Sequence, residues 1–187
     1  MSNIEISNNP RDYLHIGCIF WSLNYSDDVV FLLGQEHPEI GWPDQLKWSN
    51  FGGRPERQDK DVYTAAARET YEESLGFCGT YDEILSRILD KNNTIYYSGK
   101  AVLFGIEIDY NPDLPKLFGD VYEYTKQCMN VTRSGKSYIP SCKKEGLYEK
   151  VGLRWFNIEE IIENKDIMRP IFYKFFMDVI YPDFSQQ

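Results

Sequence analysis

The stretch from Trp48 to Phe77 constrains the fold of this chain more than any other segment. It begins with an aromatic, strand-like segment that ends at the paired glycines Gly52 and Gly53. A polar loop then leads to Asp61, and a run of strong helix formers follows. Gly76 comes after this run, at a place where glycine commonly terminates a helix. The pattern predicts a strand, a tight turn, a loop and a helix in direct succession.

The expected helix carries three acidic residues on one side. At about 100° per residue, Glu69, Glu72 and Glu73 lie within an arc of roughly 100°. Like charges at spacings of three and four residues destabilise a helix by about 0.2–0.5 kcal/mol per pair. A hard dication would account for their convergence, because Mg²⁺ prefers carboxylate oxygens and shares them with substrate phosphates. Arg68 adjoins the cluster and is suited to hold one carboxylate by a bidentate pair.

A solvated acidic helix face is the alternative interpretation, and it would be the commoner one for an isolated Arg-Glu-x-x-Glu-Glu sequence. The double glycine ahead of the helix favours the metal site. Glycine lets the backbone approach an ion or a phosphate closely, so the glycines, the loop and the acidic helix form one unit.

The same stretch resembles the Nudix box, the signature of the Nudix hydrolases. The family pattern is glycine, five residues, glutamate, seven residues, and then Arg-Glu-apolar-any-Glu-Glu-any-Gly-apolar. Here the box runs from Gly53 to Phe77, with Asp59 in place of the first glutamate and Thr70 at the apolar position. The loop has one extra residue, and the closing glycine, Gly76, is displaced by one place.

The resemblance implies an α/β/α sandwich with a mixed sheet, and hydrolysis of a diphosphate linkage with Mg²⁺ or Mn²⁺. The implied metal ligands are the Gly52 carbonyl, Glu69, Glu72 and Glu73. Glu69, or Glu149 from the loop before the last strand, would activate water, with Glu145 as the next candidate. Arg68 would orient the glutamates, and Asp59 would support Arg68 or a second ion.

The remaining chain reads as alternating strands and helices. Prolines at 112 and 115 are expected to break any element there, and a helix is expected only from residue 120 to 129. Asn157 is expected to cap a short helix. The expected strands are 13–23, 29–35, 46–51, 94–98, 100–109 and 151–156, and the other helices 81–90 and 171–180. This order suggests a mixed sheet covered on both faces, in one domain from residue 11 to 187 after a flexible leader, residues 1–10.

Composition fits this architecture and excludes other classes. The chain has 187 residues and is 42% hydrophobic, which suits one packed globular domain. A net charge of −9 argues against general binding to nucleic-acid backbones or anionic membranes. Four scattered cysteines show no zinc-ligand spacing. We find no signal peptide and no apolar run near 18 residues, so we expect a cytoplasmic protein without a membrane span.

Candidates for substrate binding lie outside the box. Trp42 and Trp48 are suited to stack on a base, although core packing is the alternative and is favoured for each. The basic segment 126–150, which includes Lys136 and Lys143, is a candidate cradle for phosphates, with a solvated loop as the equal alternative. We expect a small nucleotide substrate, a nucleoside diphosphate linked to another group. Capped RNA is possible but not favoured. His15 is expected to be a packed residue.

Two other hypotheses remain. A Nudix-fold module that binds a nucleotide or protein without turnover is favoured by Asp59 and the displaced glycine. Retention of Arg68 and all three glutamates opposes it, since a binding module has no need of mutually repelling charges. An unrelated acidic α/β domain is the third hypothesis.

Overall fold

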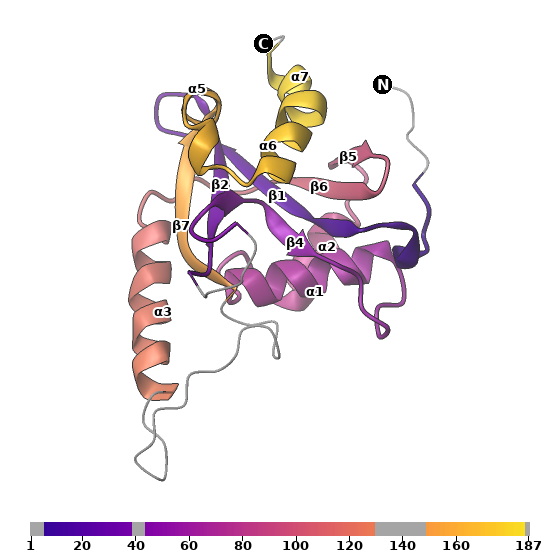
Figure 1. Ribbon diagram of the computed structural model, residues 1–187, viewed down its shortest axis with the longest axis horizontal. Coiled ribbons are helices and arrows are strands. Elements are labelled where there is room, and N and C mark those ends of the chain that lie inside the picture. The colour runs from indigo at the N-terminus through magenta and orange to yellow at the C-terminus, as the bar shows by residue number, and fades with distance from the viewer. Residues whose placement is uncertain (1–5, 39–43, 130–148, 186–187) are drawn as a thin grey trace.

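The computed structural model describes residues 6–38, 44–129 and 149–185, shown in Figure 1. Its elements are η1 (Pro10–Asp12), β1 (His15–Leu23), β2 (Val29–Glu36), β3 (Trp48–Ser49), β4 (Phe51–Gly53), α1 (Val62–Ser74), α2 (Tyr81–Ile88), β5 (Thr94–Ser98), β6 (Ala101–Glu107), α3 (Leu114–Met129), β7 (Lys150–Asn157), α5 (Ile158–Glu163), η2 (Lys165–Ile167), α6 (Pro170–Phe175), a π-helical segment η3 (Phe176–Ile180) and α7 (Tyr181–Phe184).

The strands of the described residues form one mixed sheet in the order β3-β2-β1-β6-β5, with β7 also paired to β2 and β4 to β1. Strands β1 and β2 form an antiparallel hairpin, and β5 and β6 form a second one. Strands β1 and β6, which are far apart in the chain, pair in parallel. The mixed sheet expected from the sequence is therefore confirmed.

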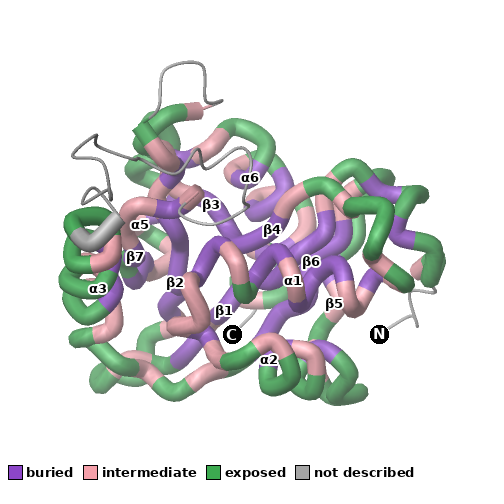
Figure 2. The backbone as a smooth tube through the Cα atoms, turned by 90° about the horizontal axis from the view of Figure 1, so that it is seen from below, coloured by how far each residue is buried: buried purple, intermediate pink, exposed green. Residues whose placement is uncertain are grey.

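Helices cover both faces of this sheet, as Figure 1 shows. The side chains of β1 and β2 alternate between two cores, as the period of two in a strand requires. Ile16, Cys18 and Phe20 join one core with α1, α2 and α3, whereas Ile19 joins the other with α5, α6 and η3. Figure 2 shows the buried backbone concentrated in the central strands. The α/β/α arrangement of the sequence analysis is confirmed.

Side-chain caps fix where several helices begin. At the start of α1, the Asp61 side chain accepts a hydrogen bond from the backbone N–H of Thr64. The Thr64 hydroxyl oxygen accepts one from the backbone N–H of Asp61, which completes a capping box. Asn157 caps α5 in the same way, as its sequence context predicts. Leu75 then ends α1 in the left-handed conformation. These contacts fix the length of the helix that carries the acidic residues.

Two glycines bring β4 directly against β1. Gly17 pairs with Gly52, and a Cβ on Gly17 would lie 2.0 Å from the carbonyl oxygen of Phe51. A Cβ on Gly52, whose φ is +156°, would lie 2.5 Å from the carbonyl oxygen of Ile16. No side chain fits between these strands, so their separation is set by backbone contact.

The expectation for residues 111–119 is wrong. Helix α3 begins at Leu114, six residues before the expected start, and Pro115 lies within its first turn. The first N–H groups of a helix have no partner inside the helix, so a proline there removes no hydrogen bond.

Part of the expected leader packs on the domain. Ile6 contacts the core that includes α1, and the carbonyl of Asn8 accepts a hydrogen bond from the backbone N–H of Val62. Two residues of this segment therefore contact the domain, Ile6 at the core and Asn8 at the first residue of α1.

Candidate active site

Two acidic residues of α1 lie directly against the paired glycines of β4. The backbone N–H of Gly52 donates a hydrogen bond to Oε2 of Glu73 at 2.7 Å, and the Glu73 side chain is only 4% exposed. Oε2 of Glu69 lies 2.5 Å from the point that a Cβ on Gly53 would occupy. The absence of a side chain at Gly53 thus creates the space that Glu69 fills.

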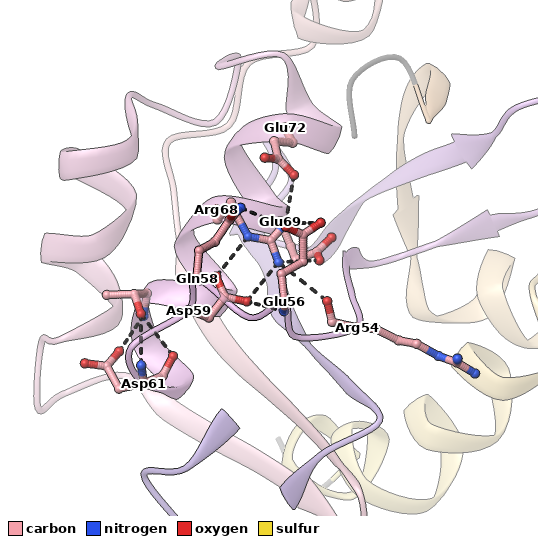
Figure 3. A network of polar contacts seen from close by, with 9 residues as sticks. Arg54, Glu56, Gln58, Asp59, Asp61, Arg68, Glu69 and Glu72 are labelled. Carbon is pink, nitrogen blue, oxygen red and sulfur yellow. Dashed lines mark hydrogen bonds and ion pairs between the residues drawn. The ribbon is translucent and has the colours of Figure 1, made fainter. Parts of the chain in front are cut away.

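Arg68 lies among the neighbouring carboxylates and contacts several of them, as Figure 3 shows. Its Nε and Nη2 donate to the two oxygens of Asp59 at 2.9 and 3.0 Å, a bidentate pair. It also donates to Glu69 at 2.8 Å and to Glu72 at 2.9 Å. The aspartate that replaces the box glutamate therefore reaches Arg68, and its side chain is 3% exposed.

The carboxylates of this region are difficult to ionise in the protein alone. Burial raises the pKa of Glu69 to about 7, against the opposing effect of Arg68. Burial likewise raises the pKa of Glu149 to about 7, with Lys150 opposing. The pKa of Glu73 is raised well above its usual value by burial, and Glu36 and Glu69 add to the rise. The site has more buried negative charge than its own cations neutralise.

Lys150 is a buried member of this site and not part of a solvated basic loop. It is 0% exposed, and its Nζ donates to Oε1 of Glu36 at 2.6 Å and to Oγ of Ser49 at 2.8 Å. The same nitrogen lies 3.7 Å from Oε1 of Glu73. The sequence analysis placed Lys150 at the end of the basic segment 126–150, and the structure corrects this assignment. Its partner Glu36 lies 114 residues earlier, so no local sequence pattern predicts the pairing.

A cavity of about 580 Å³ opens beside these carboxylates. Its polar lining includes Glu73 and Glu149, and its apolar lining includes Leu103, Phe172 and Phe175. Three cationic residues that the sequence analysis did not single out also line it: Arg54, Lys100 and Arg169.

Side-chain contacts orient one of these cations, Arg169, whereas Arg54 is held through its backbone. Arg169, from the start of α6, donates to Asp44 at 3.2 Å and to Glu36 at 3.4 Å. The Arg54 carbonyl accepts a hydrogen bond from Arg68, whereas its side chain extends away from Arg68 (Figure 3). The acidic and the cationic groups therefore face one shared space.

His15 contributes a neutral polar group to the same cavity. The amide of Asn50 donates a hydrogen bond to its Nε2 at 3.1 Å, which leaves the proton on Nδ1. Burial lowers the pKa of His15 to about 4, and the nearby Arg169 and Lys150 add to the shift. The ring is therefore uncharged near neutral pH.

The residues singled out from the sequence fall into three groups. Gly52, Arg68, Glu69, Glu72, Glu73 and Glu149 lie together around the glycines and the cavity. Trp48 packs edge-on against Phe156 in the core beside α6 and is not among the cavity-lining residues of the described chain. Trp42, Lys136, Lys143 and Glu145 lie outside the described residues.

Comparison with known proteins separates fold from sequence. No protein-family model matches the sequence, and no characterised protein shows significant sequence similarity to it. A bifunctional NMN adenylyltransferase/ADP-ribose pyrophosphatase from Francisella tularensis, solved with AMP and a manganese ion, superposes with a TM-score of 0.51 at 13% identity. The alignment covers 89% of this chain and 40% of that protein. The chain thus spans less than half of that structure's length.

Nudix hydrolases are also among the matched structures. RenU from M. smegmatis gives a TM-score of 0.42 at 10% identity, over 87% of this chain and 80% of that one. A Nudix hydrolase from Nitrosomonas europaea gives 0.40 at 16% identity, over 91% and 69%. The described residues form an α/β/α sandwich with a mixed sheet, so the chain is Nudix-like in fold.

Proposed function

We propose that this protein is a metal-dependent pyrophosphohydrolase that cleaves the diphosphate linkage of a nucleoside diphosphate joined to another group. One observation carries the proposal: Glu69 and Glu73 lie buried against Gly53 and Gly52, beside Glu149 and a cavity with both charges on its walls. The fold is that of the Nudix hydrolases, but the chemistry rests on this arrangement of side chains.

The donor set fits a hard dication completed by substrate. Among the described residues, no three Asp, Glu, His or Cys side chains form a ready-made metal cage. Mg²⁺ seldom needs one, because it is usually held by one or two carboxylates together with waters and substrate phosphates. Burial raises the pKa values of Glu69 and Glu73, and a bound cation would stabilise their ionised forms, which supports binding of a cation here.

Glu69, Glu72, Glu73 and the Gly52 carbonyl are the proposed ligands for Mg²⁺ or Mn²⁺. When bound, such an ion screens the charge of the diphosphate and lowers the pKa of water. The helix side chains keep their orientation because Arg68 donates hydrogen bonds to Glu69 and Glu72, and the Gly52 N–H donates one to Glu73.

Glu149 is the stronger candidate for the general base. Its pKa of about 7 matches a base that accepts a proton near neutral pH. It lines the cavity and is not among the acids that Arg68 binds. Glu69, the other candidate, also has a pKa of about 7, but its carboxylate accepts a hydrogen bond from Arg68 and it is a proposed metal ligand.

Arg54, Lys100 and Arg169 are proposed to contact the substrate phosphates. All three line the cavity, and Arg169 is pre-oriented by Asp44 and Glu36. The apolar wall formed by Leu103, Phe172 and Phe175 offers a surface for a ring of the substrate. Trp42, Lys136 and Lys143 stay proposals for the same role. A small nucleotide fits an enclosed space of this size better than a long RNA does.

The test is a substrate panel with Mg²⁺ or Mn²⁺: nucleoside triphosphates, dinucleoside polyphosphates, NDP-sugars, NADH and capped RNA, with phosphate and pyrophosphate release measured. One class should be hydrolysed, and Glu73→Gln should abolish release while retaining cooperative unfolding. Glu163→Gln, an exposed acid on α5, is the control and should retain full activity. Undiminished turnover by Glu73→Gln would contradict the proposal. Calorimetric binding of nucleotide with Mn²⁺ but without product would favour the binding-module hypothesis instead.

A further inference from the structure

The buried ammonium of Lys150 joins three elements that are remote in sequence. It donates hydrogen bonds to Glu36 at the end of β2 and to Ser49 in β3. It also forms an ion pair with Glu73 in α1 at 3.7 Å. All four residues are buried, with at most 3% of each residue exposed, so these contacts are shielded from solvent. A fully buried lysine is rare unless it is paired in this way.

An irregularity in the sheet aims Lys150 at this point. Gln35 of β2 pairs with Gly152 of β7, but the next residue, Glu36, pairs with Lys150, so Val151 is an extra residue. Cross-strand partners project to the same face, and a bulge re-aims a side chain. In a regular ladder Glu36 would face Val151, and the ammonium would lie on the wrong side of the strand.

Gly34 gives the lysine stem the space it needs. A Cβ at Gly34 would lie 2.9 Å from both Cγ and Cδ of Lys150, closer than real side chains pack. The bulge and this glycine therefore act on the same side chain: one aims it and the other makes room for it.

The Glu73 carboxylate is consequently fixed at both oxygens. Oε2 accepts the hydrogen bond of the Gly52 N–H at 2.7 Å, and Oε1 faces the Lys150 ammonium. A carboxylate held in this way cannot rotate freely when a cation approaches. Groups that hold metal ligands from behind typically change metal affinity or activity about 10- to 100-fold when they are removed.

We propose that Lys150 is a positioning residue, whose ammonium, anchored by Glu36 and Ser49, holds the Glu73 carboxylate in the orientation that receives the metal ion. This inference rests on the proposed function for the presence of that ion. Lys150 acts through Glu73 and does not contact the substrate.

Removing Lys150 alone would mix several effects. It would leave Glu36 as a buried charge without its lysine, which strongly destabilises a fold. It would also remove a positive charge that repels a metal ion, and this change alone would strengthen binding. The double variant Glu36→Gln with Lys150→Met limits both effects, because the net charge is unchanged and Glu36 leaves no buried charge behind, while Glu73 keeps the hydrogen bond from the Gly52 N–H.

The experiment is a Mn²⁺ titration of the full chain without nucleotide, followed by electron paramagnetic resonance. The double variant should bind Mn²⁺ about 10- to 100-fold more weakly than wild type, with cooperative thermal unfolding retained in EDTA. The control replaces an exposed pair of α3 in the same way, Lys116→Met with Asp120→Asn, and should bind like wild type.

A folded double variant with wild-type Mn²⁺ affinity would overturn the inference and leave the proposed function standing. Wild-type protein that binds no Mn²⁺ would overturn both. Should the double variant not fold, Gly34→Ala replaces it, because the added methyl displaces the lysine stem and removes no charge. Weaker Mn²⁺ binding by Gly34→Ala supports the inference, and unchanged binding refutes it.

Discussion

The guanidinium of Arg68 and the carboxylate of Asp59 form two parallel hydrogen bonds, at 2.9 and 3.0 Å, at the base of the acidic helix. Asp59 stands where the Nudix box has glutamate, and its shorter side chain still reaches Arg68. The departure from the family pattern therefore preserves a partner for the arginine.

Arg68→Lys should lower kcat about 10- to 100-fold, since lysine keeps the charge but cannot hold Asp59 bidentately while binding Glu69 and Glu72. The measurement is steady-state hydrolysis of the substrate identified by the panel. Arg154→Lys is the matched control, because Arg154 makes a single exposed ion pair with Glu160. Equal activity of the two variants would show that the bidentate pair is dispensable.

Gly53→Ala should impair activity far more than stability. The added methyl would lie 2.5 Å from Oε2 of Glu69, so that carboxylate must move away from β4, whereas the backbone itself is not obstructed. We expect at least a tenfold loss of activity, measured with the same substrate, and a small change in thermal midpoint. Gly119→Ala is the control, because nothing lies within 4 Å of its new methyl and alanine favours α3 by about 1 kcal/mol. Full activity of Gly53→Ala would mean that Glu69 is not positioned by the glycine.

His15→Gln should become progressively more stable than wild type as the pH falls from 6.5 toward 4. The pKa of His15 is lowered to about 4 in the folded protein, so in this window only the unfolded chain gains the proton and wild type loses stability. The difference in the free energy of unfolding should grow to at most about 3 kcal/mol. Urea unfolding at pH 7, 5.5 and 4.5 measures it, and a pH-independent difference would contradict the buried, neutral ring.

Glu149→Gln should show the opposite trend in metal-free protein. The pKa of Glu149 is raised to about 7, so wild type loses stability as the pH rises from about 4.5 through 7, when the unfolded chain ionises first. Glutamine carries no such penalty, and the variant should gain about 1–3 kcal/mol relative to wild type across this range, with no further change above it. Urea unfolding in EDTA at pH 4.5, 6 and 8 tests this, and a constant difference would place Glu149 in solvent.

Local patterns predicted the regular elements and the acidic helix. The glycines, the helix formers and the acids of residues 48–77 are contiguous, and the cap at Asn157 depends on its neighbours alone. The start of α3 could not be found in this way, because a proline breaks a helix interior yet fits its first turn, as Pro115 does.

The supporting residues of the site escaped prediction because they are joined only by the fold. Lys150 and Glu36 are 114 positions apart and meet through a bulge that no composition reveals. Arg169 reaches the cavity only because α6 begins beside β3, where its backbone N–H donates to the Trp48 carbonyl. Trp48 itself is an aromatic residue near the box that packs against Phe156, which the sequence could not distinguish from a stacking platform.

The direct backbone contact between Gly17 and Gly52 has a consequence for the connection from β4 to α1. Pairing with β1 fixes the position of Gly52, and α1 packs against both β1 and β4. The distance from the glycines to the glutamates therefore does not depend on the number of residues in the loop between β4 and α1. One additional residue between Gly53 and Arg68 can then bow outward without spreading the groups that flank it. A change in the length of this loop is therefore compatible with an unchanged arrangement of the site. A single methyl group on Gly17, by contrast, would force β1 and β4 apart.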